Sequence, residues 1–456
     1  MTQDSDTACA TEMLTRDRRS SQASDSTDPA PGAAPTGSLT IPQGSALAIS
    51  AVLGTGVITL PAIAAGIAGP ASLVAWLALV LLSVPLASTF AAMGARFPDG
   101  GGVSTYVGRA FGRRASAAVG WCFFFAVPVG APPASLMAGG YVADVVGGGH
   151  RTAVAVAVCL ILGVALLNAA GLRLSGRVQL VMTGTLAALM VVTVVTALPH
   201  ARLGNLTPFA PHGWSAVGPA AALLVWGFAG WEAVASLAGD YRRPGRDVPR
   251  ATGVALVVVG VLYLALAATS LLVLGAATGD SQAPLSDLLA AGVGGQVRAV
   301  TAAVAVLLTF GAMNAYYAGG SRLGASLARE GALPAYLARG SGPGEVPRRA
   351  LALIAVESLA GLVVSEVLGL GFTPLMLLAT GCFTLVYVLG TGAAVRLLPR
   401  GTRVWWTALV ALASVLVLLV MNGWHVLWAL GVAVAAVGYV SYRERARAGR
   451  NARRDT

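Results

Sequence analysis

Lysine is absent from this chain of 456 residues, so all 30 of its basic residues are arginines. A Walker A phosphate loop requires a lysine, and so does Schiff-base chemistry with pyridoxal phosphate. The absence of lysine therefore excludes a Walker-type ATPase site and lysine-dependent catalysis within this chain.

Clusters of metal-binding or nucleophilic side chains are missing as well. The cysteines and histidines stand far apart, at Cys9, Cys122, Cys159 and Cys382 and at His150, His200, His212 and His425. No CxxC motif or disulfide framework is visible. We therefore expect no metal ion, no cofactor and no enzyme-type arrangement of nucleophile and base.

Charged residues are also few in this chain. Only 11% of the residues are charged, against about 25% in a typical soluble protein, and 56% are hydrophobic, with a mean hydropathy of +0.76. Uncharged apolar runs of about 18 residues or more recur along the chain. This pattern predicts an all-α integral membrane protein.

The apolar runs predict twelve transmembrane helices within residues 41–441. Their expected ranges are 44–68, 71–93, 116–146, 152–170, 178–199, 217–239, 250–276, 298–320, 349–368, 372–397, 404–421 and 423–441. Residues 1–40, rich in Ser, Thr, Asp, Pro and Gly, are expected to form a disordered tail, and the first apolar run is too long for a signal peptide. Residues 442–456 form a basic tail.

The arginines predict the orientation. With twelve spans, 27 of them fall on one side, here called the arginine-rich side, and only Arg151, Arg202 and Arg298 fall on the other. The positive-inside rule makes the arginine-rich side cytoplasmic, so both termini are expected in the cytoplasm of a bacterial cell with the chain in its inner membrane. The terminal run YRERARAGRNARR could be taken for a nucleic-acid patch, but its place directly after the last span favours contact with anionic lipid headgroups.

Two spans carry glycines where lipid most demands an unbroken helix. Span 1 contains Gly54-Thr55-Gly56, and span 6, five spans later, contains the run 226–232, WGFAGWE. Glycine-interrupted segments at matching positions of two halves indicate a transporter binding site. A broken helix exposes N–H groups suited to a carboxylate and carbonyls suited to an ammonium group, as in a zwitterionic amino acid.

The alternative is that these glycines only allow close helix packing. Because both spans 1 and 6 carry such glycines, we favour a substrate-binding site over close packing alone. Its candidate substrate-binding residues are Leu53, Gly54, Thr55, Gly56, Val57, Trp226, Gly227, Phe228, Ala229, Gly230 and Trp231. At least one of the three aromatic residues among them is a candidate gate over a bound side chain.

Glu232 is the only acidic residue near the middle of a span, where a carboxylate costs about 2.5–3.5 kcal/mol to insert. It is either a proton carrier or a hydrogen-bond partner of backbone freed by the break. Glu357 is expected to be a structural hydrogen-bond partner. Thr309 and Asn314 of span 8 could add polar contacts or bridge helices, and the lack of an adjacent Ser/Thr pair there disfavours a sodium site.

Five stretches in this order resemble the amino acid–polyamine–organocation transporter family. They are GTGVITLP (54–61), RFPDGGGVSTYVGRAFG (96–112), WGFAGWE (226–232), DYRRPGRDVPRA (240–251) and SRLGASLAREGALP (321–334). With FAVPVGAPPASLMAGGYV (125–142), the first stretch further resembles bacterial exporters of methionine and branched-chain amino acids.

The resemblance implies a LeuT-like fold of two inverted five-helix repeats, about 44–199 and 217–397, followed by two extra helices within 404–441. It implies that Thr55 and Gly56 meet the substrate carboxylate, that Trp226 and Gly227 lie at the substrate, and that Glu232 matches the family's span-6 glutamate. Span 5 lacks the lysine that some proton-coupled relatives carry there.

The function expected is therefore secondary transport, not catalysis: a proton-coupled exporter of small neutral amino acids (methionine, leucine, isoleucine, valine). An importer or exchanger of amino acids or amines is the rival within this class, and a transport-inactive amino acid sensor is the rival outside it. The expected partners are the substrate, protons and the lipid bilayer, without nucleic acid, and no feature of the sequence selects an oligomeric state.

Overall fold

The computed structural model describes residues 39–53, 55–97, 102–171, 176–232, 238–340 and 345–452, and these residues fold into helices joined by short loops. Ten helices within them are long and apolar enough to cross a membrane. A single isolated bridge, between Leu39 and Tyr241, is the one extended pairing of the described residues. The expected all-α, multi-span membrane architecture is confirmed.

The long helices correspond to the expected spans 2–5 and 7–12, and two of them continue further than expected, to Arg329 and to Ala452. They are α4 (Ser72–Arg96), α6 (Arg113–Val146), α7 (Gly149–Ala169), α8 (Gly176–Ala197), α11 (Pro244–Leu274), α13 (Arg298–Arg329), α14 (Arg348–Val367), α15 (Thr373–Leu397), α16 (Arg403–Met421) and α17 (Val426–Ala452). Spans 1 and 6 are each interrupted. Span 1 consists of α2 (Ile41–Val52), the 3₁₀ turn η1 (Thr55–Ile58) and α3 (Leu60–Ala68), and span 6 begins with α9 (Val217–Phe228).

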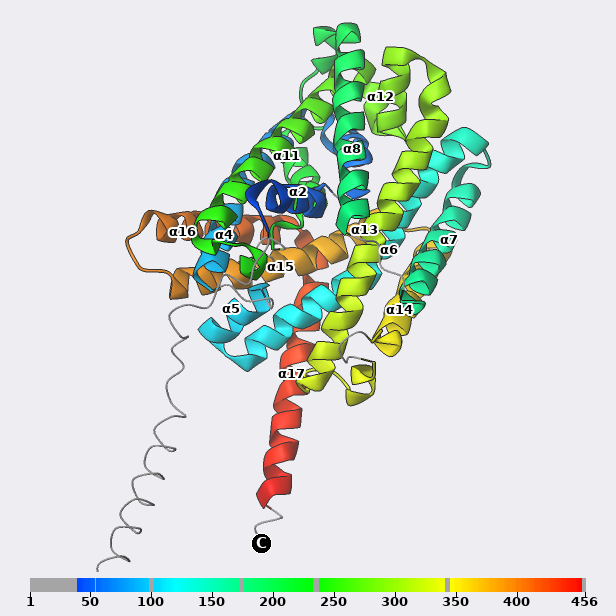
Figure 1. The fold of residues 1–456 in the computed structure, drawn as a ribbon. Helices are drawn as coiled ribbons and strands as arrows, with labels where there is room; N and C mark the ends of the chain where they lie inside the picture. Colours follow the sequence, from blue (N-terminus) through cyan, green and yellow to red (C-terminus); the bar gives the residue numbers. More distant parts are fainter. Residues whose placement is uncertain are drawn as a thin grey trace, which may run out of the picture.

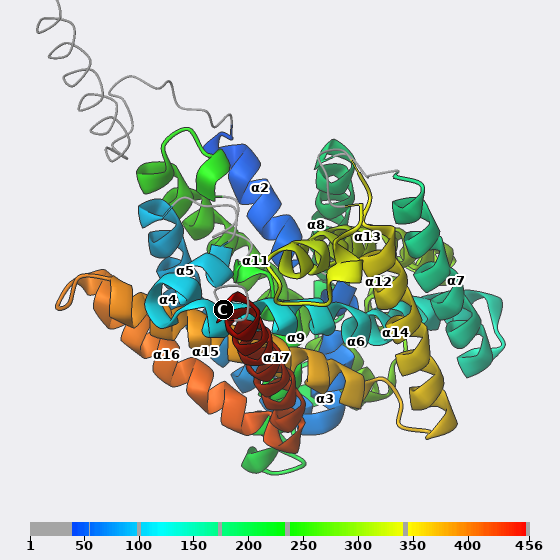
Figure 2. The same ribbon diagram turned by 90° about the horizontal axis from the view of Figure 1, so that it is seen from below.

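Helix α6 lies at the centre of the molecule. It packs against α7, α13, α14, α15 and α17, and Figure 1 shows it running beside α13. Seen from below, α16 lies at one edge of the bundle and α7 and α14 lie at the opposite edge (Figure 2). The buried residues of α6 include many of its small side chains and all three of its prolines, which lets these neighbours approach closely.

Two short helices lie in loops where no helix was expected. Helix α5 (Gly102–Phe111) precedes α6 on the arginine-rich side, and α12 (Pro284–Val293) lies between α11 and α13 on the other side. At ten residues each they are too short to span a bilayer, so hydropathy did not reveal them.

The last helix runs on past the apolar region, because α17 continues to Ala452. Glu444 on this extension forms ion pairs with Arg113 and Arg114 at the start of α6, at 3.7 and 3.0 Å. The end of the chain is thereby joined to the central helix.

Candidate functional site

The first break separates α2 from α3. Helix α2 ends at Val52 and is followed by Leu53, η1 begins at Thr55, and α3 begins at Leu60. Pro61 lies in the first turn of α3, where a proline's missing N–H costs nothing. The glycine–threonine interruption of span 1 is therefore a real interruption of the helix. Gly54 and the side chain of Thr55 lie outside the described residues.

The second break lies at Ala229 and Gly230. Helix α9 ends at Phe228, Ala229 is extended (φ −66°, ψ 143°), Gly230 has φ 123°, and helical structure resumes at Trp231. A Cβ atom on Gly230 would lie 2.5 Å from the carbonyl oxygen of Ala51. Glycine is required here both by the positive φ and by the contact, so the two breaks touch through their backbones.

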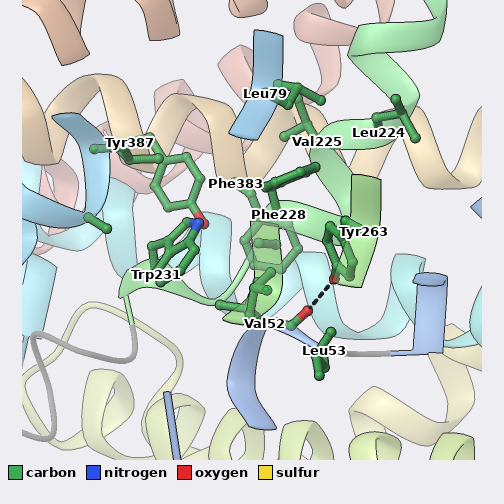
Figure 3. Packing of buried hydrophobic residues seen from close by; sticks show 14 of the residues in the cluster. Val52, Leu53, Leu79, Leu224, Val225, Phe228, Trp231, Tyr263, Phe383 and Tyr387 are labelled. Carbon is green, nitrogen blue, oxygen red and sulfur yellow. Dashed lines mark hydrogen bonds between the residues drawn. The ribbon is translucent and has the colours of Figure 1, made fainter. Parts of the chain in front are cut away.

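Tyr263 of α11 joins the two breaks. Its hydroxyl oxygen lies 2.9 Å from the carbonyl oxygen of Val52 and 2.7 Å from that of Gly227. Figure 3 shows the hydroxyl directed at the Val52 carbonyl. A hydroxyl has one proton, so it donates to one carbonyl at a time and holds both within reach.

Tyr141 of α6 supports the other end of the first break. Its hydroxyl donates to the carbonyl oxygen of Ile58 in η1 at 2.6 Å and accepts the N–H of Leu285 in α12 at 3.1 Å. One buried side chain thus connects the broken helix with the short helix α12. Tyr141 and Tyr263 satisfy carbonyls that an interrupted helix leaves unpaired.

Glu232 holds the second break. Its Oε2 accepts the N–H of Gly230 at 2.9 Å and the hydroxyl of Tyr387, on α15, at 2.5 Å. Of the two roles expected for Glu232, the structure displays the hydrogen bond to backbone freed by the break. The same contacts leave its carboxylate tied to the geometry of that break.

A cavity lies beside both breaks. Its walls come from spans 1, 3, 6, 8 and 10 and are mostly apolar. They comprise Ala51, Val52, Gly56, Ala126, Val127, Gly130, Ala131, Ala134, Trp226, Ala229, Ala312, Met313, Tyr316, Tyr317 and Phe383. No charged side chain lies among these lining residues.

Three of the eleven expected binding residues line this cavity: Gly56, Trp226 and Ala229. The others that the structure describes lie around it. Leu53, Val57, Phe228 and Trp231 are buried in the apolar core, Gly227 presents its carbonyl to Tyr263, and Gly230 rests against Ala51.

The three aromatic residues near the second break differ in their surroundings. A Cβ on Gly56 would lie 2.9 Å from the indole nitrogen of Trp226, and one on Gly130 would lie 2.9 Å from its Cη2. Trp226 therefore fits between two glycines across the cavity. By contrast, Phe228 packs on Trp76 and Tyr263, and the Trp231 indole donates to Ser83 at 3.2 Å.

The polar residues of spans 8 and 9 that were considered as candidates do not line the cavity. Asn314 accepts a hydrogen bond from Asn168 of α7 at 2.7 Å, so it bridges helices, one of the two roles expected. Buried oxygens of Thr309 and Glu357 have no hydrogen-bond partner among the described residues. The structural partner expected for Glu357 is therefore absent from the part of the chain described.

The sequence profile of the family described as "Amino acid permease" matches residues 39–439. The chain belongs to this family. Amino acid permeases of this type are membrane transporters of the amino acid–polyamine–organocation group, so the protein is an amino acid transporter and not an enzyme. The family implies the LeuT-like arrangement of helices.

Two bacterial relatives match this chain over most of its length. An uncharacterized amino acid permease of Bacillus subtilis, YecA, is 33% identical over 88% of this chain and 94% of its own length. The L-methionine/branched-chain amino acid exporter YjeH of Escherichia coli is 32% identical over 86% and 93%. The branched-chain amino acid permease BcaP of B. subtilis is 25% identical over about half of each chain. These bacterial relatives point to a cell-membrane location.

Proposed function

We propose that this permease exports neutral, mainly apolar amino acids by alternating access around the cavity between its two broken helices. The observation that carries the proposal is the contact of both breaks at one cavity: Gly56 and Ala229 line it, and Gly230 touches the end of α2. Backbone freed at these points is tolerated in a membrane only where it is satisfied by protein or faces a polar ligand.

The substrate's two charges would be held by backbone. The N–H groups that follow the first break, at Thr55 and Gly56, are the first of η1 and have no partner within that turn, which suits a carboxylate. The last carbonyls of α9, around Trp226, carry the negative end and suit an ammonium group. This assignment follows the pattern of discontinuous transporter helices.

The lining of the cavity determines which substrate side chains are accepted. Val127, Met313 and Phe383 line the cavity, and a charged substrate side chain would lose its hydration there without gaining an ion pair. Methionine, leucine, isoleucine and valine match such a lining. The names of the relatives YjeH and BcaP, both concerned with branched-chain amino acids, support the same class.

Glu232 would couple transport to protons. Its Oε2 accepts two hydrogen bonds, and a proton placed on that oxygen would turn an acceptor into a donor and displace one of them. Binding a proton would therefore loosen the second break. If a proton enters the cell in exchange for each substrate that leaves, the inward proton gradient of a bacterium would drive export.

Transport of labelled methionine or leucine by the purified protein in liposomes tests this function. An inward proton gradient should drive export, with arginine and glutamate as substrates that are refused. No flux of any amino acid, with substrate-dependent binding retained, would instead favour the sensor. In cells, overproduction should protect against a toxic leucine analogue, whereas sensitisation would favour an importer or exchanger.

A further inference from the structure

Four arginines gather where the chain enters the first broken helix. They line a surface pocket, together with the residues that begin α2 and one acid. The lining residues are Leu39, Thr40, Ile41, Pro42, Arg242, Arg243, Arg246, Asp247 and Arg250. All four arginines are exposed.

Among the residues that the structure describes, the acids of the pocket do not balance its four arginines. Asp247 is its only acid, and this carboxylate accepts the backbone N–H of Arg243 at 3.2 Å, where it caps the first turn of α11. None of the ion pairs among the described residues involves Arg242, Arg243, Arg246 or Arg250. The pocket therefore holds a surplus of guanidinium groups with free donors.

The sequence around the pocket indicates that it lies at the edge of the membrane on the arginine-rich side. Arg250 directly precedes Ala251, where the apolar part of α11 begins, and Ile41 is the first residue of α2. The partly exposed side chains of Leu39 and Ile41 give it an apolar wall beside the charges. A ligand in this pocket would contact both the guanidinium groups and the apolar side chains.

Backbone pairing connects the start of the first broken helix to the segment before α11. The N–H of Leu39 donates to the carbonyl of Asp240 at 3.0 Å, and the N–H of Arg242 donates to the carbonyl of Leu39 at 3.5 Å. Gly44 of α2 lies against the ring of Tyr241. The start of α2 is thus fastened to the segment that leads into α11.

We propose that this pocket binds the phosphate group of an anionic phospholipid, with the arginines forming charge-assisted hydrogen bonds to its oxygens and the apolar wall meeting its acyl chains. A bound lipid bridges the start of α2 to α11 and stabilises the conformation in which the two are joined. This effect on transport rests on the proposed function, whereas lipid binding can be measured independently of transport.

Native mass spectrometry of the full-length protein, incubated with equal amounts of phosphatidylglycerol and phosphatidylcholine, tests the site. The double variant Arg242→Gln/Arg246→Gln should retain at least about tenfold less phosphatidylglycerol than the unaltered protein. The matched control Arg400→Gln/Arg403→Gln loses the same charge on the same side, outside the pocket, and should retain it normally. The variant Arg242→Lys/Arg246→Lys, which keeps the charge, should retain most of it.

Equal phosphatidylglycerol retention by the pocket variant and the control would overturn the proposal. Inorganic phosphate, titrated into detergent-solubilised protein, distinguishes the source of the phosphate. If phosphate alone displaces phosphatidylglycerol at millimolar concentration, the pocket is a site for a free anion and the lipid assignment is wrong. Loss of lipid binding in a variant that still transports would leave the proposed function standing.

Discussion

The hydroxyl oxygen of Tyr263 lies within hydrogen-bond distance of the carbonyls of both Val52 and Gly227, one from each broken helix. A third helix thereby fixes the relative position of the two breaks. If transport requires the two breaks to separate and rejoin, the Tyr263 hydroxyl would stabilise the conformation in which they are in contact.

The variant Tyr263→Phe should lower the transport rate about tenfold and the free energy of unfolding by about 1–3 kcal/mol, because it leaves buried carbonyls without a donor. Initial rates in liposomes and thermal melting in nanodiscs measure the two effects. Tyr106→Phe is the control, since the Tyr106 hydroxyl meets the Phe97 carbonyl at 3.4 Å, away from the breaks. Equal behaviour of the two variants would remove Tyr263 from the transport cycle.

Gly230→Ala should abolish transport. The substitution places a Cβ 2.5 Å from the Ala51 carbonyl and forces alanine to φ 123°, a backbone strain of about 1–3 kcal/mol before the clash is counted. Gly253→Ala, at a helical glycine with open space around it, is the matched control and should transport normally. Normal flux through Gly230→Ala would mean that the breaks need not touch.

Trp226→Ala should change which side chains the permease accepts. Removing the indole that lies between Gly56 and Gly130 enlarges the cavity, so the ratio of kcat/KM for phenylalanine to that for valine should rise at least about tenfold. Competition assays in liposomes measure this ratio. Trp406→Ala, at an exposed tryptophan of α16, should leave the ratio unaltered, and an unaltered ratio in Trp226→Ala would place the substrate elsewhere.

Glu232→Gln should flatten the pH dependence of transport, because the amide cannot take up the proton that we assign to Oε2. Flux measured across a range of pH, with and without a proton gradient, is the readout. Tyr387→Phe, which removes one of the two donors to Oε2, should shift the pH profile and not flatten it. If Glu232→Gln keeps the pH profile of the unaltered protein, Glu232 serves only to hold the break.

Arg298→Gln should loosen α12 with little effect on overall stability. Its guanidinium pairs with Asp144 of α6 and with Asp287 of α12, at 2.6 and 2.9 Å, so one side chain joins the two helices. Each such pair contributes about 0.2–1 kcal/mol. Hydrogen exchange should quicken in α12, and Arg202→Gln, without an ion pair in the described chain, should not quicken it.

Most ends of the spanning helices were predictable to within a few residues, because uncharged runs long enough to cross a bilayer are bounded by arginines, glycines and prolines. The exceptions are α11, which begins earlier than expected at Pro244, and α13 and α17, which continue past the apolar region to Arg329 and Ala452. Both breaks were also predictable, since paired glycines at matching places in two spans are typical of interrupted transporter helices. For Gly230 the structure adds a reason that no pattern shows, namely the backbone of Ala51 against which it rests.

The tyrosines that support the breaks were not predictable. Tyr141, Tyr263 and Tyr387 stand singly in apolar spans, where an isolated tyrosine is typical of packing. Their partners are backbone or side-chain atoms 83, 211 and 155 residues away. These hydrogen bonds depend on tertiary contacts between spans, which the local sequence pattern does not predict.

Equilibrium binding of leucine analogues to the purified permease tests most directly whether backbone at the two breaks holds the substrate's charges. Leucine should bind, whereas leucinamide, which lacks the carboxylate, and 4-methylpentanoate, which lacks the ammonium group, should each bind at least about a hundredfold more weakly, since each leaves one helix end without its charged partner. Binding of either analogue as tight as that of leucine would contradict a site formed by the two broken helices.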